Sequence, residues 1–224
     1  MTSQTQPNDT ENRQRQLVEA LVGYGVFCVL GLTSRFIPVV FAVFVAYGIL
    51  FPLIYAGLTR NWSALGFSGP NRLSALTWGV AAGVVWSMYT LLFFQRDRPL
   101  SPLWGLQAAI ALPMWLLVLS PFQEFFFRGW LQPRLQSLAG RRAGLGITAL
   151  AFGLWHYLPQ LEGTSTTTLP LGSPLGLLST ILAGLLFGYI FERTENIIAP
   201  CLAHAIGGTT LVLVGQMSFI HYIP

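Results

Sequence analysis

The sequence predicts an all-α, polytopic membrane helical bundle with seven to eight transmembrane helices. Only 9% of the 224 residues are charged and 53% are hydrophobic, whereas an ordinary soluble domain carries about a quarter charged residues. The mean hydropathy is positive, and several apolar stretches approach the length of about 20 residues that a helix needs to cross a bilayer. Lipid must therefore surround most of this protein.

We expect a disordered polar tail over residues 1–16, followed by a single membrane domain over 17–224. The first apolar run lacks an Ala-x-Ala cleavage site, so we interpret it as a retained span. Residues 121–138 form an additional segment with charges at helical spacing, and the polar residues 159–173 are a solvated connector or, alternatively, a gate for substrate. The remaining helices are predicted near 17–34, 37–58, 73–94, 103–121, 145–158, 174–191 and 197–215.

The basic residues indicate a topology and give no sign of nucleic-acid binding. All 12 are arginines, and they lie singly or in pairs between apolar stretches. Positive charge favours the cytoplasmic side, which predicts a multi-pass cell-membrane protein with a cytoplasmic N-terminus, and the short, lysine-free chain suggests a bacterial plasma membrane. The other side receives Arg35, Arg96 and Arg98, against eight on the cytoplasmic side: Arg13, Arg15, Arg60, Arg72, Arg134, Arg141, Arg142 and Arg193.

Two Gly-x-x-x-Gly pairs, Gly79 with Gly83 and Gly184 with Gly188, lie in apolar helices. Small residues four apart let helix backbones approach closely in lipid, so we assign both pairs to packing. No internal repeat is visible, and the first three spans are almost free of polar residues. These features disfavour a transporter or channel.

Four ionisable side chains lie deep in the predicted bundle: Glu124, Arg128, His156 and His204. Each would cost about 2.5–3.5 kcal/mol as a charge at the centre of a membrane helix, so each needs a reason. Glu124 and Arg128 share one helix face, which is also consistent with a simple internal ion pair. A lone membrane histidine is usually a packing residue, but two histidines and a carboxylate on three helices favour a common site. His221 is assigned no role.

The segments around these residues resemble the three motifs of the CPBP (CAAX protease and bacteriocin-processing) family of intramembrane endopeptidases, which includes the type II CAAX prenyl endopeptidases. That family shows Glu-Glu-x-x-x-Arg, then Phe-x-x-x-His, then His-x-x-x-Asn. The resemblance extends over about residues 103–215, with matching order and spacing. The corresponding residues here are Gln123-Glu124-x-x-x-Arg128, Phe152-x-x-x-His156 and His204-x-x-x-Gly208.

The resemblance implies hydrolysis of a peptide bond near the membrane, with Glu124, His156 and His204 catalytic and Gln123 and Arg128 supporting. His156, with a glutamate, would activate water, and His204 would donate a hydrogen bond to the oxyanion. The implied partners are a peptide or protein substrate and the bilayer; substrate identity and oligomeric state stay open. No cofactor is implied. Zinc is an alternative, because two histidines and a glutamate can bind it, although His-Glu-x-x-His is absent.

Two residues depart from the family pattern. Gln123 replaces the first glutamate, and a neutral amide cannot take a proton from water. Gly208 replaces the asparagine, and the loss of one oxyanion donor costs about 100- to 1,000-fold in turnover. Glu124 could replace the missing base only if a local bulge re-aimed it, because successive helical residues point about 100° apart. The alternative function is a catalytically weakened pseudoprotease that binds hydrophobic peptides or partner helices.

Overall fold

Seven continuous helical stretches make up the described part of the chain, and no strand occurs there. The computed structural model describes residues 9–34, 36–67, 71–94, 101–156 and 174–215. The all-α prediction is confirmed, and five of the stretches are long and apolar enough to cross a membrane. The seven are α1 (Asp9–Thr33), α2 (Pro38–Thr59), α3 (Arg72–Phe94), the stretch Trp104–Ala139, α7 (Arg141–Trp155), α8 (Pro174–Thr194) and α9 (Ile198–Leu213).

The stretch Trp104–Ala139 corrects the prediction of two segments at 103–121 and 121–138. It is one helix of 36 residues, about 54 Å long at 1.5 Å per residue. Pro121 follows a π-helical turn in which the Ser120 N–H bonds to the Trp115 carbonyl. Such wide turns occur inside otherwise continuous helices, and the chain stays helical through this point. Its parts are α4 (Trp104–Met114), η1 (Trp115–Leu119), α5 (Ser120–Glu124), η2 (Phe125–Leu131) and α6 (Gln132–Ala139).

The N-terminal tail is shorter than predicted, because α1 already begins at Asp9. Polar side chains hold its first turns in place. Arg15 pairs with Glu19 at 2.9 Å one turn later, and Arg13 donates to the Leu138 carbonyl at 3.0 Å. Residues 9–16 are therefore helical, and residues 1–8 lie outside the described part, as does the connector 159–173.

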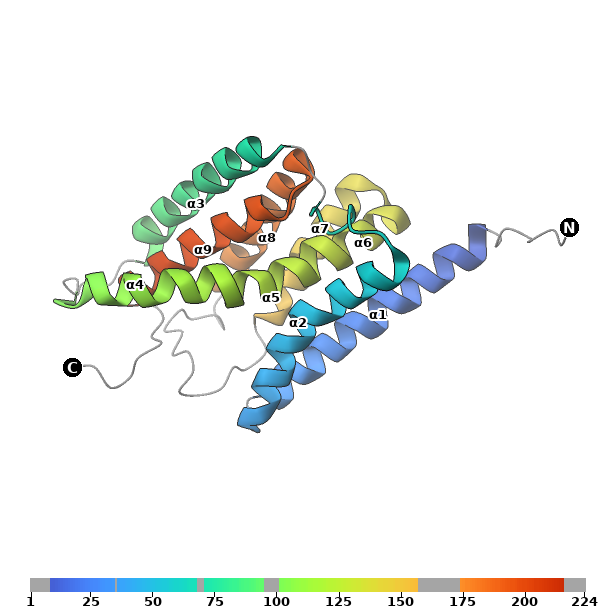
Figure 1. The fold of residues 1–224 in the computed structure, drawn as a ribbon, viewed down its shortest axis with the longest axis horizontal. Helices are drawn as coiled ribbons and strands as arrows, with labels where there is room; N and C mark the ends of the chain where they lie inside the picture. The colour runs from blue at the N-terminus through green and yellow to red at the C-terminus, as the bar shows by residue number, and fades with distance from the viewer. Residues whose placement is uncertain (1–8, 35, 68–70, 95–100, 157–173, 216–224) are drawn as a thin grey trace, which may run out of the picture.

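The long helix separates two groups of helices, as Figure 1 shows, with α1 and α2 on one side and α3, α8 and α9 on the other. Both glycine pairs lie at close helix contacts, as predicted. A Cβ on Gly79 would approach the Ala199 carbonyl oxygen to 2.8 Å, and one on Gly184 would approach the Ala149 Cα to 2.9 Å. These contacts pack α3 against α9 and α7 against α8.

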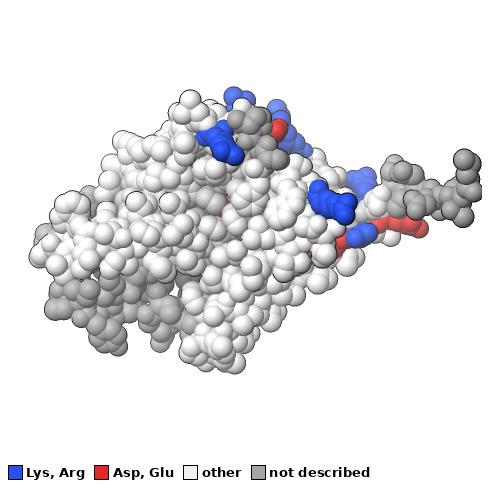
Figure 2. All heavy atoms as spheres, viewed as in Figure 1, with Lys and Arg blue, Asp and Glu red and all other residues white. Residues whose placement is uncertain are grey.

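Arginine side chains gather along one side of the molecule, the upper right in Figure 2, which we call the arginine-rich end. Arg134 contacts Glu19 at 3.3 Å, and Arg141 contacts Glu192 at 2.8 Å, which ties the start of α1 to α6 and the start of α7 to the end of α8. Gly140 makes the tight turn between α6 and α7 with φ of 85°, a backbone conformation that favours glycine. Which side of the membrane these arginines face stays a prediction; Arg35, Arg96 and Arg98 lie outside the described residues.

Candidate active site

A buried carboxylate joins two of the predicted motifs. The Glu124 Oε1 atom lies 2.6 Å from His204 Nδ1, and its Oε2 atom lies 3.1 Å from Arg128 Nε. The side chains of Glu124 and Arg128 are both 0% exposed. The ion pair anticipated from the i, i+4 spacing is therefore present, but it also orients the histidine of α9.

The Arg128 guanidinium is held from three directions. Its Nη1 atom donates to Glu124 Oε1 at 3.2 Å, and its Nη2 atom donates to the Gly184 carbonyl at 3.1 Å. It also lies over the Phe152 ring, 4.3 Å from the centroid. A buried charge needs such partners because desolvation alone costs several kcal/mol per ion. Gly184 thus contributes its carbonyl to the site as well as its small size to packing.

His156 lies at the end of α7 with a defined tautomer. Its Nδ1 atom is 2.6 Å from the Phe152 carbonyl oxygen. Because a carbonyl oxygen only accepts, Nδ1 carries the proton, and Nε2 of the neutral ring is left as an acceptor. His156 is also partly exposed. The Nε2 acceptor therefore belongs to a residue at a partly exposed helix end.

Phe152 connects the two histidines. Its ring centroid lies 4.5 Å from that of His156 and 6.0 Å from that of His204. No hydrogen bond links His156 directly to Glu124 or His204 among the described residues. The structure therefore brings Glu124, Arg128 and His204 into direct contact and places His156 beside them across one aromatic ring.

Gln123, the neighbour of Glu124, is 5% exposed. Within the described residues, its buried Oε1 atom has no hydrogen-bond partner, and the same holds for Ser120 Oγ, three residues earlier. Buried polar atoms are normally satisfied by protein or by ordered water. Gln123 and Ser120 thus form a polar stripe on α5 that can hold water.

A wide turn lies beside Glu124, as catalysis by this residue would require. The π-helical segment η2 begins at Phe125, directly after Glu124. Single π-helical turns inside α-helices often occur at functional sites because they re-aim side chains. No motif or spacing in the sequence indicates this turn. In the structure, however, Glu124 is directed to Arg128 and His204.

Trp115 is the site residue that sequence reasoning missed. Its side chain is buried, and its ring centroid lies 5.2 Å from that of His204. A Cβ added to Gly208 would fall inside the Trp115 indole. The indole therefore occupies the space beside Gly208 where the family's asparagine side chain would begin. No spacing rule links residues 93 positions apart in the chain, and only the helix packing reveals the pair.

Among the described residues, no group of three His, Cys, Asp or Glu side chains is spaced to hold a metal ion. Glu124 is occupied by Arg128 and His204, and His156 makes its Nδ1 contact with a backbone carbonyl. A reaction without a metal or other cofactor therefore stays our prediction.

Comparison with known proteins shows that the stretch carrying this site is similar to one family. Residues 103–209 match the family described as type II CAAX prenyl endopeptidase Rce1-like, a range that contains Gln123, Glu124, His156, His204 and Gly208. Neither the curated proteins nor the solved structures contained a match. The matched range covers just under half of the chain, including every residue of the three motifs. Residues 103–209 of this chain are therefore similar to the Rce1-like type II CAAX prenyl endopeptidase family.

Proposed function

We propose that this protein is an intramembrane endopeptidase that hydrolyses a peptide bond near the membrane surface. The observation that carries the proposal is the contact between Glu124 and His204, with His156 beside them, inside the family's matched range. A carboxylate and two imidazoles from three helices provide the acid–base groups that amide hydrolysis needs.

In the proposed reaction, His156 Nε2 takes a proton from water as the water oxygen attacks the peptide carbonyl carbon. The carbonyl oxygen becomes an oxyanion. His204 bonds to Glu124 through Nδ1, and the carboxylate stabilises an imidazolium whose Nε2–H can donate to that oxyanion. When the intermediate collapses, the C–N bond breaks, and the leaving amine takes the proton held by His156.

Gln123 has a binding role in this proposal. Its amide can hold the attacking water by hydrogen bonds but cannot remove a proton from it. Its buried Oε1 atom, which lacks a partner among the described residues, supports this assignment. His156 is then the base, and water reaches the site at the partly exposed end of α7.

We further propose a location and a substrate class. The arginine-rich end faces the cytoplasm, which puts the N-terminus inside, in a bacterial plasma membrane. The substrate is a peptide or protein at the membrane, and no nucleic acid is involved. The family description includes prenylated peptides, so a prenylated and an unprenylated peptide of the same sequence are the natural pair of probes.

Replacement of His204 with alanine tests the proposal. We expect the wild-type protein in proteoliposomes to cleave at least one of a farnesylated CAAX peptide, its unprenylated form or a pool of apolar peptides. The His204→Ala variant should cleave at least about 100-fold more slowly, the typical effect of losing one oxyanion donor. Products are followed by mass spectrometry.

The matched control is His221→Ala, which removes the histidine to which no role is assigned. It should retain wild-type cleavage. If His204→Ala cleaves as fast as the wild type while remaining folded, the proposed mechanism is wrong.

Trp115 and Gly208 favour a second candidate, a catalytically weakened protein that binds apolar peptides or partner helices. The indole fills the asparagine space, and both oxygens of Glu124 are engaged. Because of these contacts, Gln123→Glu and Gly208→Asn alone are not expected to restore the family's active site.

We expect Gly208→Asn alone to destabilise the protein by about 1–3 kcal/mol, the usual cost of overpacking. Adding Trp115→Ala should recover much of this loss, as measured by unfolding in detergent. Adding Gln123→Glu as well then restores the family pattern. If the wild type already cleaves as fast as this triple variant, the weakened-enzyme interpretation is excluded.

A further inference from the structure

A cavity of about 260 Å³ lies at the arginine-rich end of the molecule, away from the candidate active site. It is partly open and is lined by α1, α2, the segment 61–65 and the last turns of the long helix, and its lining includes none of Glu124, His156 and His204. One part of its wall is apolar, with Pro52, Ala56 and Leu65, and polar side chains such as Gln16 and Asn61 complete it. The cavity therefore offers both an apolar and a polar surface.

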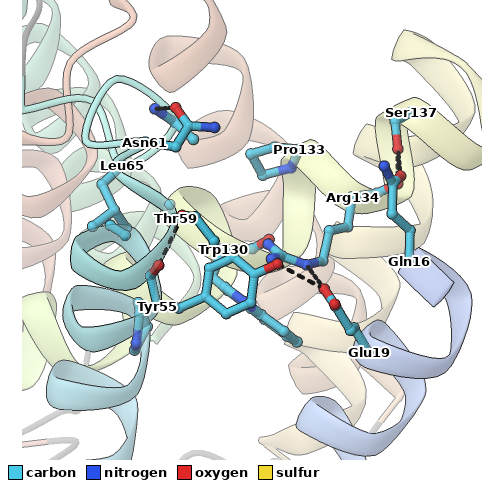
Figure 3. Close-up of a pocket in the computed structure, with 14 residues that line it drawn as sticks. Gln16, Glu19, Tyr55, Thr59, Asn61, Leu65, Trp130, Pro133, Arg134 and Ser137 are labelled. Atoms are coloured by element: carbon cyan, nitrogen blue, oxygen red, sulfur yellow. Dashed lines mark hydrogen bonds and ion pairs between the residues drawn. The ribbon is translucent and has the colours of Figure 1, made fainter. Parts of the chain in front are cut away.

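Arg134 is the central polar residue of this cavity and is held in a fixed orientation. Its guanidinium lies over the rings of Tyr55 and Trp130, with centroid distances of 4.2 Å and 4.3 Å. Its Nη1 atom donates to the Trp130 carbonyl at 2.8 Å and its Nε atom to Glu19 Oε2 at 3.3 Å. Figure 3 shows Glu19 of α1 and Tyr55 of α2 meeting at this arginine.

One edge of the Arg134 guanidinium remains available. The Nη2 atom has no hydrogen-bond acceptor among the described residues, although only 12% of the side chain is exposed. A guanidinium that is immobilised between aromatic rings loses little further entropy when it binds an anion. Arg134 is thus prepared to donate hydrogen bonds to an oxyanion in the cavity.

The charge around the cavity also favours an anion. Glu19 accepts hydrogen bonds from Arg15 at 2.9 Å, from Tyr55 at 2.9 Å and from Arg134. Arg13 bonds to the Leu138 carbonyl, next to Ser137 in the cavity lining. Two arginines therefore share the carboxylate of Glu19, Arg13 adds a third positive charge, and the net charge of this network is positive.

The depth of the cavity indicates where the anion comes from. Tyr55 and Thr59 lie in the last turns of α2, where a span of 22 residues ends, and Arg134 lies near the end of the long helix. Arginines at this level are placed to meet lipid phosphates. The apolar wall can contact the glycerol and the first acyl carbons of a lipid. A free phosphate ion would leave this wall uncovered.

We propose that this cavity binds the headgroup of an anionic membrane phospholipid, with the phosphate on Arg134 Nη2. This site is independent of peptide hydrolysis. Its lining residues come from α1, α2 and α6, among others, so a lipid bound here would contact all three helices. The two N–H groups of Arg134 Nη2 can donate charge-assisted hydrogen bonds to phosphate oxygens.

The test is lipid retention by the full-length protein. The protein is reconstituted into nanodiscs with equal amounts of phosphatidylglycerol and phosphatidylcholine, and the lipids that remain bound after extraction are counted by native mass spectrometry. We expect the wild type to retain phosphatidylglycerol selectively. Arg134→Gln should reduce its retention by about tenfold or more, as expected for the loss of a charge-assisted hydrogen bond.

Arg142→Gln is the matched control, because it removes the same charge from the same end of the molecule at an exposed residue outside the cavity lining. It should reduce retention clearly less than Arg134→Gln. Equal losses in both variants would mean that only the general surface charge attracts lipid, and the proposed site would be wrong. Ala64→Leu, which narrows the cavity and keeps Arg134, should also reduce retention and decides the question if Arg134→Gln does not fold.

Inorganic phosphate distinguishes the two sources of the anion. The proposal expects that millimolar phosphate leaves the bound phosphatidylglycerol in place, because phosphate makes no contact with the apolar wall. Displacement of the lipid by phosphate, or equal retention of phosphatidylcholine, would overturn it.

Discussion

Replacement of His156 with alanine is expected to lower the rate of peptide cleavage by about 100- to 10,000-fold, the range that a general base contributes. The Phe152 carbonyl holds the Nδ1 proton, so Nε2 is the acceptor that takes the proton from water. Gln123 cannot replace it, because an amide does not act as a base at neutral pH. The rate is measured as product formed in proteoliposomes at saturating peptide.

The separation of kcat from KM makes this prediction specific. A base acts only in the chemical step, so kcat should fall while KM stays near the wild-type value. His156→Ala should also unfold at nearly the wild-type temperature, since the ring is partly exposed. A variant with unchanged kcat would show that another group activates the water.

The second large effect concerns stability. Glu124→Gln removes the carboxylate beside Arg128 and leaves a guanidinium of 0% exposure without a counter-charge. Breaking a buried pair in this way costs about 3–5 kcal/mol. Glu124→Gln should therefore unfold at much lower denaturant concentration in detergent, and cleavage should fall because His204 Nδ1 loses its negatively charged partner.

A double variant separates the two roles of Glu124. Combining Glu124→Gln with Arg128→Met removes both charges and keeps similar volume, which is often close to neutral for stability. We expect stability to recover in large part while cleavage stays low. If the double variant is no more stable than Glu124→Gln, the buried charge of Arg128 is not the cause of the loss; if it cleaves at the wild-type rate, Glu124 has no part in the reaction.

Much of the fold could be predicted from apolar length alone. The helices expected at 37–58, 73–94 and 174–191 correspond to α2 (Pro38–Thr59), α3 (Arg72–Phe94) and α8 (Pro174–Thr194), because lipid requires long apolar helices with internally satisfied backbones. The two errors have local causes. The charges at helical spacing in 121–138 suggested a separate segment, but the helix continues through the π-helical turn before Pro121. The polar residues 9–16 are helical because contacts with α6 hold them.

The candidate site could be predicted only in part, because its contacts join different helices. Spacing placed Glu124 and Arg128 on one helix face, and the ion pair is present. Spacing within a helix cannot indicate what a different helix brings to that face. The contact of Glu124 with His204, 80 residues away in the chain, and the indole of Trp115 beside Gly208 both depend on how α9 packs against the long helix.

The sequence by itself determined that this is a polytopic helical protein and which few polar side chains carry its chemistry, because charges inside a membrane are costly and therefore rare. The tertiary structure alone decided the partners of those side chains: the carboxylate on His204, the carbonyl that sets the His156 tautomer, and the indole that fills the space beside Gly208. The physical reason is that composition and periodicity act along one helix, whereas the direction of a buried side chain is set by the neighbouring helices that pack against it.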